Sequence, residues 1–189
     1  MDDRLETERL ILRRFTDADV DDLFVLHNDP EVMRFLTGGD PIPREEIERE
    51  YRDRFAGSGY WVATDRASGA FLGWFALHPV ENRPADETEL GYRLRASAWG
   101  KGLATEGAHA LIRAGFERHG LRLVFAETMA VNLPSRRVME KCGLRHVRTF
   151  HLEWDDPLPG TEHGEVEYAL DRADWERNHA PENASSADE

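Results

Sequence analysis

The first half of the chain alternates between stretches with apolar residues at every second position and stretches with a helical period. Residues 7–15 alternate strictly and predict a strand. Thr16 or Asp17 then caps an expected helix that runs to about Asn28, where Asp29-Pro30 ends it. Further along, the pattern predicts a helical turn over residues 30–36, a charged helix over 44–55, a hairpin of strands 59–64 and 69–77, and a strand over 87–94.

The second half begins with a glycine-rich turn and an amphipathic helix that His119-Gly120 closes. A buried type of strand over 121–129 follows, then a short helix from Asn132 to Gly143, in which Asn132 is a suitable cap. Strands are expected over 144–154 and 164–170. The pattern predicts one α/β (α+β) domain over residues 1–178, with a polar, disordered tail over 179–189.

Charge and cysteine content narrow the class of protein. The 189 residues carry a formal net charge of −13, which argues against binding nucleic acid over a broad surface. The lone Cys142 excludes a disulfide framework, and no apolar run of membrane-spanning length occurs, so we expect a cytoplasmic protein that does not bind membranes. Residues 91–148 nevertheless hold eleven Lys and Arg against four Asp and Glu. This basic segment, in an acidic protein, indicates a polyanionic ligand.

The turn Trp99-Gly100-Lys101-Gly102-Leu103 lies between a strand and a helix, where free backbone N–H groups and the helix dipole favour phosphate. The turn matches neither of two nucleotide-binding motifs. A P-loop needs Gly-Lys followed by Ser or Thr, whereas Lys101 precedes the second glycine. A dinucleotide fingerprint needs Gly or Ala where Thr105 stands and an acidic residue about twenty residues after it, where the chain has Leu-Arg-Leu.

Four motifs together resemble the GNAT acetyltransferase superfamily, and within it the ribosomal-protein N-terminal acetyltransferases (the RimJ/RimL-like group). They are Thr7-Glu-Arg-Leu-x-Leu-Arg, Glu89-Leu-Gly-Tyr, Trp99-Gly-Lys-Gly-Leu-Ala-Thr-Glu and Asn132-x-x-Ser-x-x-x-Met-Glu-Lys-x-Gly143. Trp99 departs from the superfamily's Arg or Gln at that position, but main-chain groups hold the pyrophosphate there. The resemblance implies the GNAT fold, a mixed and mostly antiparallel sheet of about seven strands splayed at the acetyl-CoA-binding strand and flanked by helices.

The same resemblance implies direct acetyl transfer from acetyl-CoA to a primary amine. Leu94 would polarise the thioester carbonyl, Ser135 would be the general acid, and Glu153 or Glu89 the general base, with His151 and His78 as lesser options. The coenzyme-binding residues implied are Leu94, Arg95, Trp99, Gly100, Lys101, Gly102, Leu103, Ala104, Thr105, Asn132, Ser135 and Arg137. Capping alone would also explain Asn132 and Ser135. The histidines are scattered without ligand spacing, so no metal is implied.

The acceptor is expected to bind between the first helices and the loop at residues 155–165. Both regions are acidic: the first has Asp17, Asp19, Asp21, Asp22 and Asp29, and the second has Asp155, Asp156, Glu162 and Glu165. This favours a cationic acceptor, either a protein N-terminal amine, which the resemblance favours, or a polyamine- or aminoglycoside-like molecule. A non-catalytic coenzyme A-binding module is a second reading. A nucleotide-dependent phosphotransferase is a third, which the missing Walker lysine position argues against. The family also implies a possible homodimer.

Overall fold

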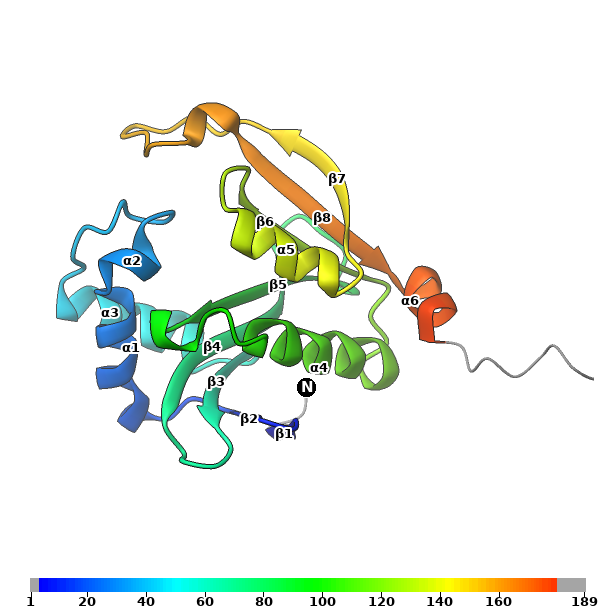
Figure 1. Cartoon of the computed structure of the whole chain (residues 1–189), viewed down its shortest axis with the longest axis horizontal. Helices are drawn as coiled ribbons and strands as arrows, with labels where there is room; N and C mark the ends of the chain where they lie inside the picture. The colour runs from blue at the N-terminus through cyan, green and yellow to red at the C-terminus, as the bar shows by residue number, and fades with distance from the viewer. Residues whose placement is uncertain (1–3, 180–189) are drawn as a thin grey trace, which may run out of the picture.

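A computed structural model describes residues 4–179, whose core is an eight-stranded sheet with helices on both faces (Figure 1). The strand order is β1-β2-β3-β4-β5-β6-β8-β7, and every neighbouring pair is antiparallel except β5–β6. The strands are β1 (Arg4–Glu6), β2 (Leu10–Arg13), β3 (Tyr60–Asp65), β4 (Phe71–Pro79), β5 (Glu87–Leu94), β6 (Leu123–Met129), β7 (Arg145–Phe150) and β8 (Glu165–Asp171).

Two separate apolar cores lie on the two faces of this sheet. Helix α4 packs on one face beside α5, and α1 and α3 pack on the other. The helices are α1 (Val20–His27), α2 (Pro30–Met33), α3 (Arg44–Glu50), α4 (Leu103–Arg118), α5 (Leu133–Lys141) and α6 (Arg172–His179), and α3 continues as the π-helical turn η2 (Tyr51–Phe55). The predicted mixed α/β class is therefore confirmed. No helix of the described part of the chain is both long and apolar enough to cross a membrane.

The main differences from the sequence prediction are two strand ends and one additional helix. The expected first strand begins later, at Leu10, because Thr7 N–H bonds to the Leu10 carbonyl and closes a hairpin with β1, which adds the eighth strand. Strand β7 ends at Phe150 rather than at residue 154. Residues 172–179 form the unpredicted helix α6, whose start is stabilised by the Asp171 side chain accepting from Asp174 N. The expected tail lies outside the described residues except for His179, which ends α6.

The sheet divides in its middle. Parallel pairing of β5 with β6 covers only three positions, Glu87–Glu89 against Leu123–Phe125. Beyond them β5 still pairs with β4 as far as Leu94, and β6 still pairs with β8 as far as Met129. The two strands therefore diverge and leave a gap between two halves of the sheet, as the resemblance implied. We call this opening the β5–β6 gap.

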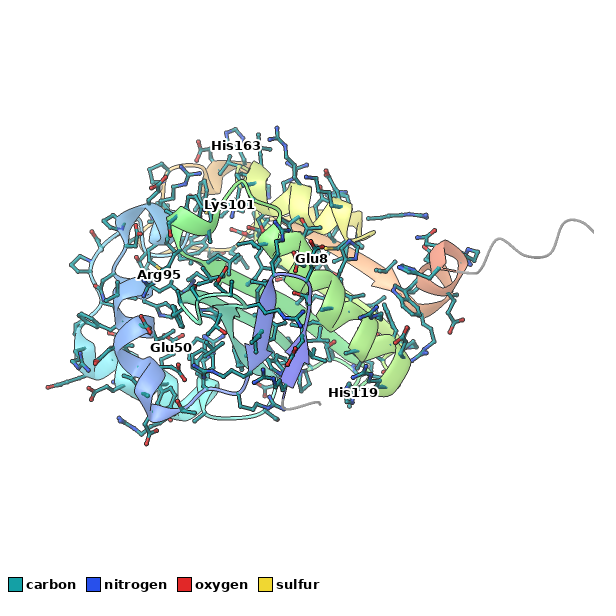
Figure 2. All side chains as sticks on the ribbon, turned by 60° about the horizontal axis from the view of Figure 1, so that its bottom comes forward. Glu8, Glu50, Arg95, Lys101, His119 and His163 are labelled. Carbon is teal, nitrogen blue, oxygen red and sulfur yellow. The ribbon has the colours of Figure 1, made fainter. Side chains whose placement is uncertain are left out.

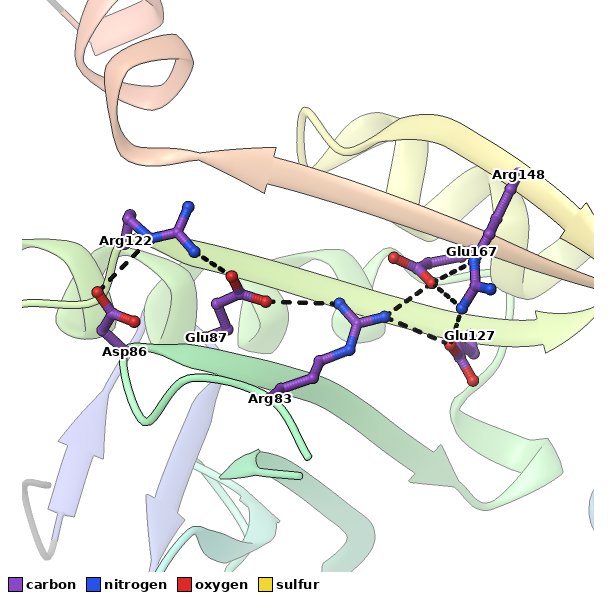
Figure 3. A network of polar contacts seen from close by, with 7 residues as sticks. All are labelled: Arg83, Asp86, Glu87, Arg122, Glu127, Arg148 and Glu167. Atoms are coloured by element: carbon purple, nitrogen blue, oxygen red, sulfur yellow. Dashed lines mark hydrogen bonds and ion pairs between the residues drawn. The ribbon is translucent and has the colours of Figure 1, made fainter. Parts of the chain in front are cut away.

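A polar network joins the two halves at the closed end of the gap (Figure 3). Buried Glu167 of β8 accepts from Arg83 at 2.8 Å and from Arg148 at 2.7 Å. Burial opposes ionisation of Glu167, but these two hydrogen bonds outweigh it and lower its pKa. The network continues through Glu87 to Arg122 and Asp86, and through Glu127 of β6. Main-chain pairing at this end is therefore reinforced by side chains from both halves.

Candidate active site

The main chain of β5 supplies the first part of the site. Arg95 N–H donates to the Leu72 carbonyl of the neighbouring segment, so by the alternation of an antiparallel pair Leu94 directs its N–H away from β4, towards the β5–β6 gap. Gly73 on β4 makes this arrangement possible, since a Cβ there would lie 2.1 Å from the Arg93 carbonyl oxygen and 2.7 Å from Leu94 Cα. Sequence reasoning missed Gly73, because its need arises only from this cross-strand contact.

The glycine-rich turn follows directly. Gly100 and Gly102 have φ of +71° and +78°, which L side chains rarely adopt, and they turn the chain into α4 at Leu103. Trp99 Nε1 donates to the Leu94 carbonyl at 2.8 Å and so ties the turn to the end of β5. The N–H groups of the first turn of α4 have no partner within the helix. The residues present thus fit a pyrophosphate group.

The N-terminal hairpin holds this turn in place. Arg9 donates to the Lys101 carbonyl at 2.8 Å and to Glu106 in the first turn of α4 at 2.7 Å (Lys101 is labelled in Figure 2). Thr7 Oγ1 and Arg9 N–H also donate to Glu106, at 2.6 and 2.8 Å. Burial would raise the pKa of Glu106, but these hydrogen bonds lower it, so Glu106 is a carboxylate at neutral pH. Part of the resemblance motif that begins at Thr7 therefore has a structural role at the turn, which sequence reasoning did not assign.

The second predicted turn lies across the gap from β5. Asn132 caps α5 by accepting from Ser135 N–H, and Ser135 Oγ lies 3.0 Å from Tyr92 Oη. Tyr92 Oη also donates to the Ser135 carbonyl oxygen at 3.0 Å. Burial is the main cause that raises the pKa of Tyr92, so its hydroxyl stays protonated at neutral pH. Tyr92 is a hydroxyl that sequence reasoning missed, although it belongs to the quoted Glu-Leu-Gly-Tyr motif.

The other predicted coenzyme-binding residues are placed in different ways. Lys101 and Arg137 are exposed, on the turn and on α5. Arg95 instead reaches α1, where it bonds to Asp22 and covers the Phe71 ring at 5.1 Å. Of the first residues of α4, Leu103 is buried, Ala104 is partly buried against the core, and the Thr105 carbonyl accepts from Cys142 Sγ on α5 at 3.8 Å.

The two carboxylates predicted as bases differ in position. Glu89 is the last residue of β5 paired with β6, at the point where the β5–β6 gap begins, and its carboxylate lies 3.9 Å from His78 Nε2. Glu153 was expected on a strand, but it is exposed in the segment after β7. Glu127 of β6 is a third carboxylate near the opening. Burial, then the charges of Glu89 and Glu167, raise its pKa.

A cavity of about 390 Å³ lies on the other face of the sheet, between β5 and the helices α1 and α3. Its charged lining residues are Glu46, Arg49, Glu50, Asp53, Arg54 and Arg93, with His27 beside them. Acidic and basic side chains are equal in number there, so the lining has no excess of negative charge.

Each of the five aspartates in the first predicted acidic region has a structural partner. Asp19 is buried and accepts from Arg13 and from Thr16, and Asp29 caps α2. Asp17, Asp21 and Asp22 bond to Tyr51, Arg44 and Arg95, respectively. The other predicted flank does approach this region, since a Cβ on Gly38 would lie 3.0 Å from Leu158 Cδ2. Within residues 4–179, no three His, Cys, Asp or Glu side chains are grouped as metal ligands.

Comparison with known proteins identifies the family. A profile described as an acetyltransferase (GNAT) domain matches residues 9–145. The FsC-acetyl coenzyme A-N(2)-transacetylase of Aspergillus fumigatus is 41% identical over 168 residues, which cover 82% of this chain and 71% of that protein. A GNAT-family acetyltransferase from Bacillus anthracis has a similar fold, with a TM-score of 0.76 and 24% identity over 90% of this chain and 99% of the other.

A second similar structure contains coenzyme A. It is the spermidine N-acetyltransferase from Vibrio cholerae in complex with CoA and spermine, with a TM-score of 0.74 and 17% identity over 89% of this chain and 99% of the other. At this identity the likeness shows the fold alone. The family profile covers most of the chain, and the Aspergillus protein is similar over most of its own length. The chain belongs to the GNAT acetyltransferases and is an N-acetyltransferase.

Proposed function

We propose that the protein transfers the acetyl group of acetyl-CoA directly to a primary amine of a small molecule. The observation that carries this is the adjacency of two features. The β5–β6 gap, with the glycine-rich turn at its end, is suited to the coenzyme, and the cavity beyond β5 has a volume typical of small-molecule sites. The 41% identical relative is named for transfer to a numbered nitrogen, N(2), which also favours a small molecule.

Each part of the site has a role in this proposal. Gly100, Gly102 and the N-terminus of α4 would hold the pyrophosphate, and the Leu94 N–H would donate to the thioester carbonyl. Bound acetyl-CoA would supply an activated acetyl group and a thiol leaving group. The other predicted coenzyme contacts, Arg95 and Arg137 among them, are part of the same proposal.

We assign proton transfer to side chains on either side of the β5–β6 gap. We assign Glu89 as the base in preference to Glu153, because Glu89 lies at the start of the gap whereas Glu153 is exposed outside β7. Ser135 would donate a proton to the departing thiolate and regain one from solvent, while Tyr92, 3.0 Å from Ser135 Oγ, would hold that hydroxyl in place. The raised pKa of Tyr92 keeps its hydroxyl protonated, so it remains a neutral hydrogen-bond partner of Ser135.

The test combines coenzyme binding with thiol release. The protein is titrated with CoA by calorimetry and then incubated with acetyl-CoA, a thiol reagent, and a panel of small amines and short peptides with free N-termini. Thiol release with small amines supports the proposal. Release with peptides alone supports the protein N-terminal acceptor that the RimJ/RimL-like resemblance favours. Binding without release with any amine supports a non-catalytic module, and absence of CoA binding overturns the assignment of the donor.

A pair of glycine variants tests the coenzyme site itself. Gly102→Glu places a carboxylate against the pyrophosphate, so we expect no measurable CoA binding. Gly120→Glu is the matched control, because Gly120 follows the other end of α4 and also has a positive φ, +66°, with nothing within 4 Å of a Cβ. Equal loss of CoA binding in both variants would show that strain, rather than the position of the charge, is responsible.

A further inference from the structure

Arg93 differs from the other charged residues around the cavity. Glu50 pairs with Arg54 at 3.1 Å and lies 3.3 Å from His27 Nδ1, and Arg54 also donates to Tyr60 Oη at 3.0 Å. Among the described residues, no carboxylate lies within ion-pair distance of Arg93. Its guanidinium lies 5.1 Å from the centre of the Trp74 ring. A cation that lines the cavity therefore makes no direct ion pair with any described side chain, and only the more distant charge of Glu50 favours its protonated form.

The position of Arg93 on β5 brings its charge close to the proposed place of acetyl transfer. Arg93 is partly buried and lines the cavity, and it precedes Leu94, whose N–H is directed towards the β5–β6 gap. Successive residues of a strand face opposite sides of the sheet, so Tyr92 and Leu94 belong to the face of α4 and α5. Arg93 belongs to the face of the cavity. A group bound to Arg93 would hold the rest of its molecule next to the place of acetyl transfer.

Removing a guanidinium from water without a partner is unfavourable, and burial lowers the pKa of Arg93 to about 10. A bound anion would compensate for this cost. The planar fork of an arginine matches a carboxylate in two parallel hydrogen bonds. A doubly charged phosphate is less suitable here, because Glu46, Glu50 and Asp53 line the same cavity and would repel it.

We propose that the acceptor is an amine that also carries a carboxylate, and that Arg93 binds this carboxylate within the cavity. The inference rests on the proposed function, since it names the class of small-molecule amine. It makes Arg93 a specificity-determining residue that discriminates amino-acid-like acceptors from plain polyamines. The carboxylates that line the same cavity would accommodate the positive end of such a zwitterion.

The test compares lysine, lysinamide and cadaverine, which share a primary amine and differ in the carboxylate. Binding of each to the full chain is measured by calorimetry, and thiol release from acetyl-CoA is measured separately. We expect lysine to bind at least tenfold more tightly than lysinamide or cadaverine. Equal binding of the three, or no binding of lysine, overturns the proposal whether or not any of them is acetylated. Release of thiol with cadaverine alone would uphold the proposed function and overturn this inference.

Two arginine variants test whether Arg93 is responsible for the preference for lysine. Arg93→Gln is expected to remove the preference for lysine over lysinamide while the affinity for CoA stays within twofold. Arg52→Gln is the matched control, because Arg52 carries the same charge on the neighbouring turn η2 but is exposed and outside the cavity lining. A preference for lysine that survives Arg93→Gln, or that falls equally in Arg52→Gln, would overturn the assignment. The wild-type comparison above decides the proposal even if Arg93→Gln fails to fold.

Discussion

Replacing Arg9 with Ala removes the side chain that joins the N-terminal hairpin to the glycine-rich turn. Two interactions are lost, the one with the Lys101 carbonyl at 2.8 Å and the one with Glu106 at 2.7 Å. Neither involves the coenzyme directly. We therefore expect the variant to fold and to bind CoA more weakly, because the free energy of ordering the turn is then taken from binding.

The expected loss of CoA affinity in Arg9→Ala is estimated from the exposure of the Arg9 side chain. The Arg9 side chain is 45% exposed, so solvent screens its ion pair and we take about 1 kcal/mol, the upper end for exposed ion pairs. Since about 1.4 kcal/mol is tenfold in an equilibrium constant, the Kd for CoA should rise roughly fivefold. The KM for acetyl-CoA should rise with it, while kcat stays unchanged.

Glu106→Gln tests whether Glu106 acts by holding the turn in place through its hydrogen bonds, which we call bracing, or only through its negative charge. This variant removes a negative charge from the helix end that faces the pyrophosphate, so charge alone would tighten CoA binding. Bracing predicts the opposite, because Gln keeps only part of the hydrogen bonding that Thr7 and Arg9 make with the carboxylate. Calorimetric titration of both variants with CoA measures this, and Arg4→Ala, an exposed arginine on β1, is the control. A lower Kd in Glu106→Gln than in the wild type would refute the reasoning.

Three further outcomes are expected. Ser135→Ala should lower kcat roughly 10²-fold with little change in CoA affinity, and Tyr92→Phe should lower kcat less. Single-turnover thiol release measures both effects, and normal turnover in Ser135→Ala would exclude Ser135 as the general acid. Hydrogen bonds from Arg13 and Thr16 outweigh burial and lower the folded-state pKa of Asp19, so its contribution to stability is complete above the unfolded pKa and is lost as pH falls below about 4. Asp19→Asn should cost about 2 kcal/mol at pH 7 and flatten the acid limb of the thermal-unfolding profile. Gly73→Ala should destabilise by more than about 3 kcal/mol in chemical denaturation, far more than Gly69→Ala, because Gly69 also has a positive φ (+74°, against +141° at Gly73) but has open space around its Cβ.

Local signals predicted most of the fold. The two-residue and 3.6-residue periods indicated the strands from β2 to β8 and the helices α1, α3, α4 and α5, and the glycines of the turn before α4 and the Asn132 cap lie where the sequence put them. Helix α6 was missed because its residues carry little apolar periodicity, and only Trp175 is buried. The short strand β1 was missed because it depends on a hairpin contact rather than on its own three residues.

The site was predicted less completely, for a physical reason. Arg9 and Glu106 are 97 residues apart, and no local pattern announces their contact. Counting aspartates gave an acidic acceptor surface, but a count along the sequence does not show which carboxylates are occupied by caps and ion pairs, as Asp19 and Asp29 are. Alternation along β5 places Tyr92 and Arg93 on opposite faces of the sheet, a separation that formed no part of the sequence prediction. The alternation does not show which helices cover each face of the sheet.

The divergence of β5 from β6 also changes how the sheet responds to solvent. The centre of a sheet is usually its best protected part against amide hydrogen exchange. Here the strand that lies fifth of eight has, beyond Glu89, hydrogen-bonded neighbours on one side only. Every second amide along its last residues, Leu94 included, should therefore exchange as fast as one on an outer strand. Poorly protected main chain is therefore expected in the interior of this sheet as well as at its edges, and a ligand bound in the gap would slow the exchange of these amides.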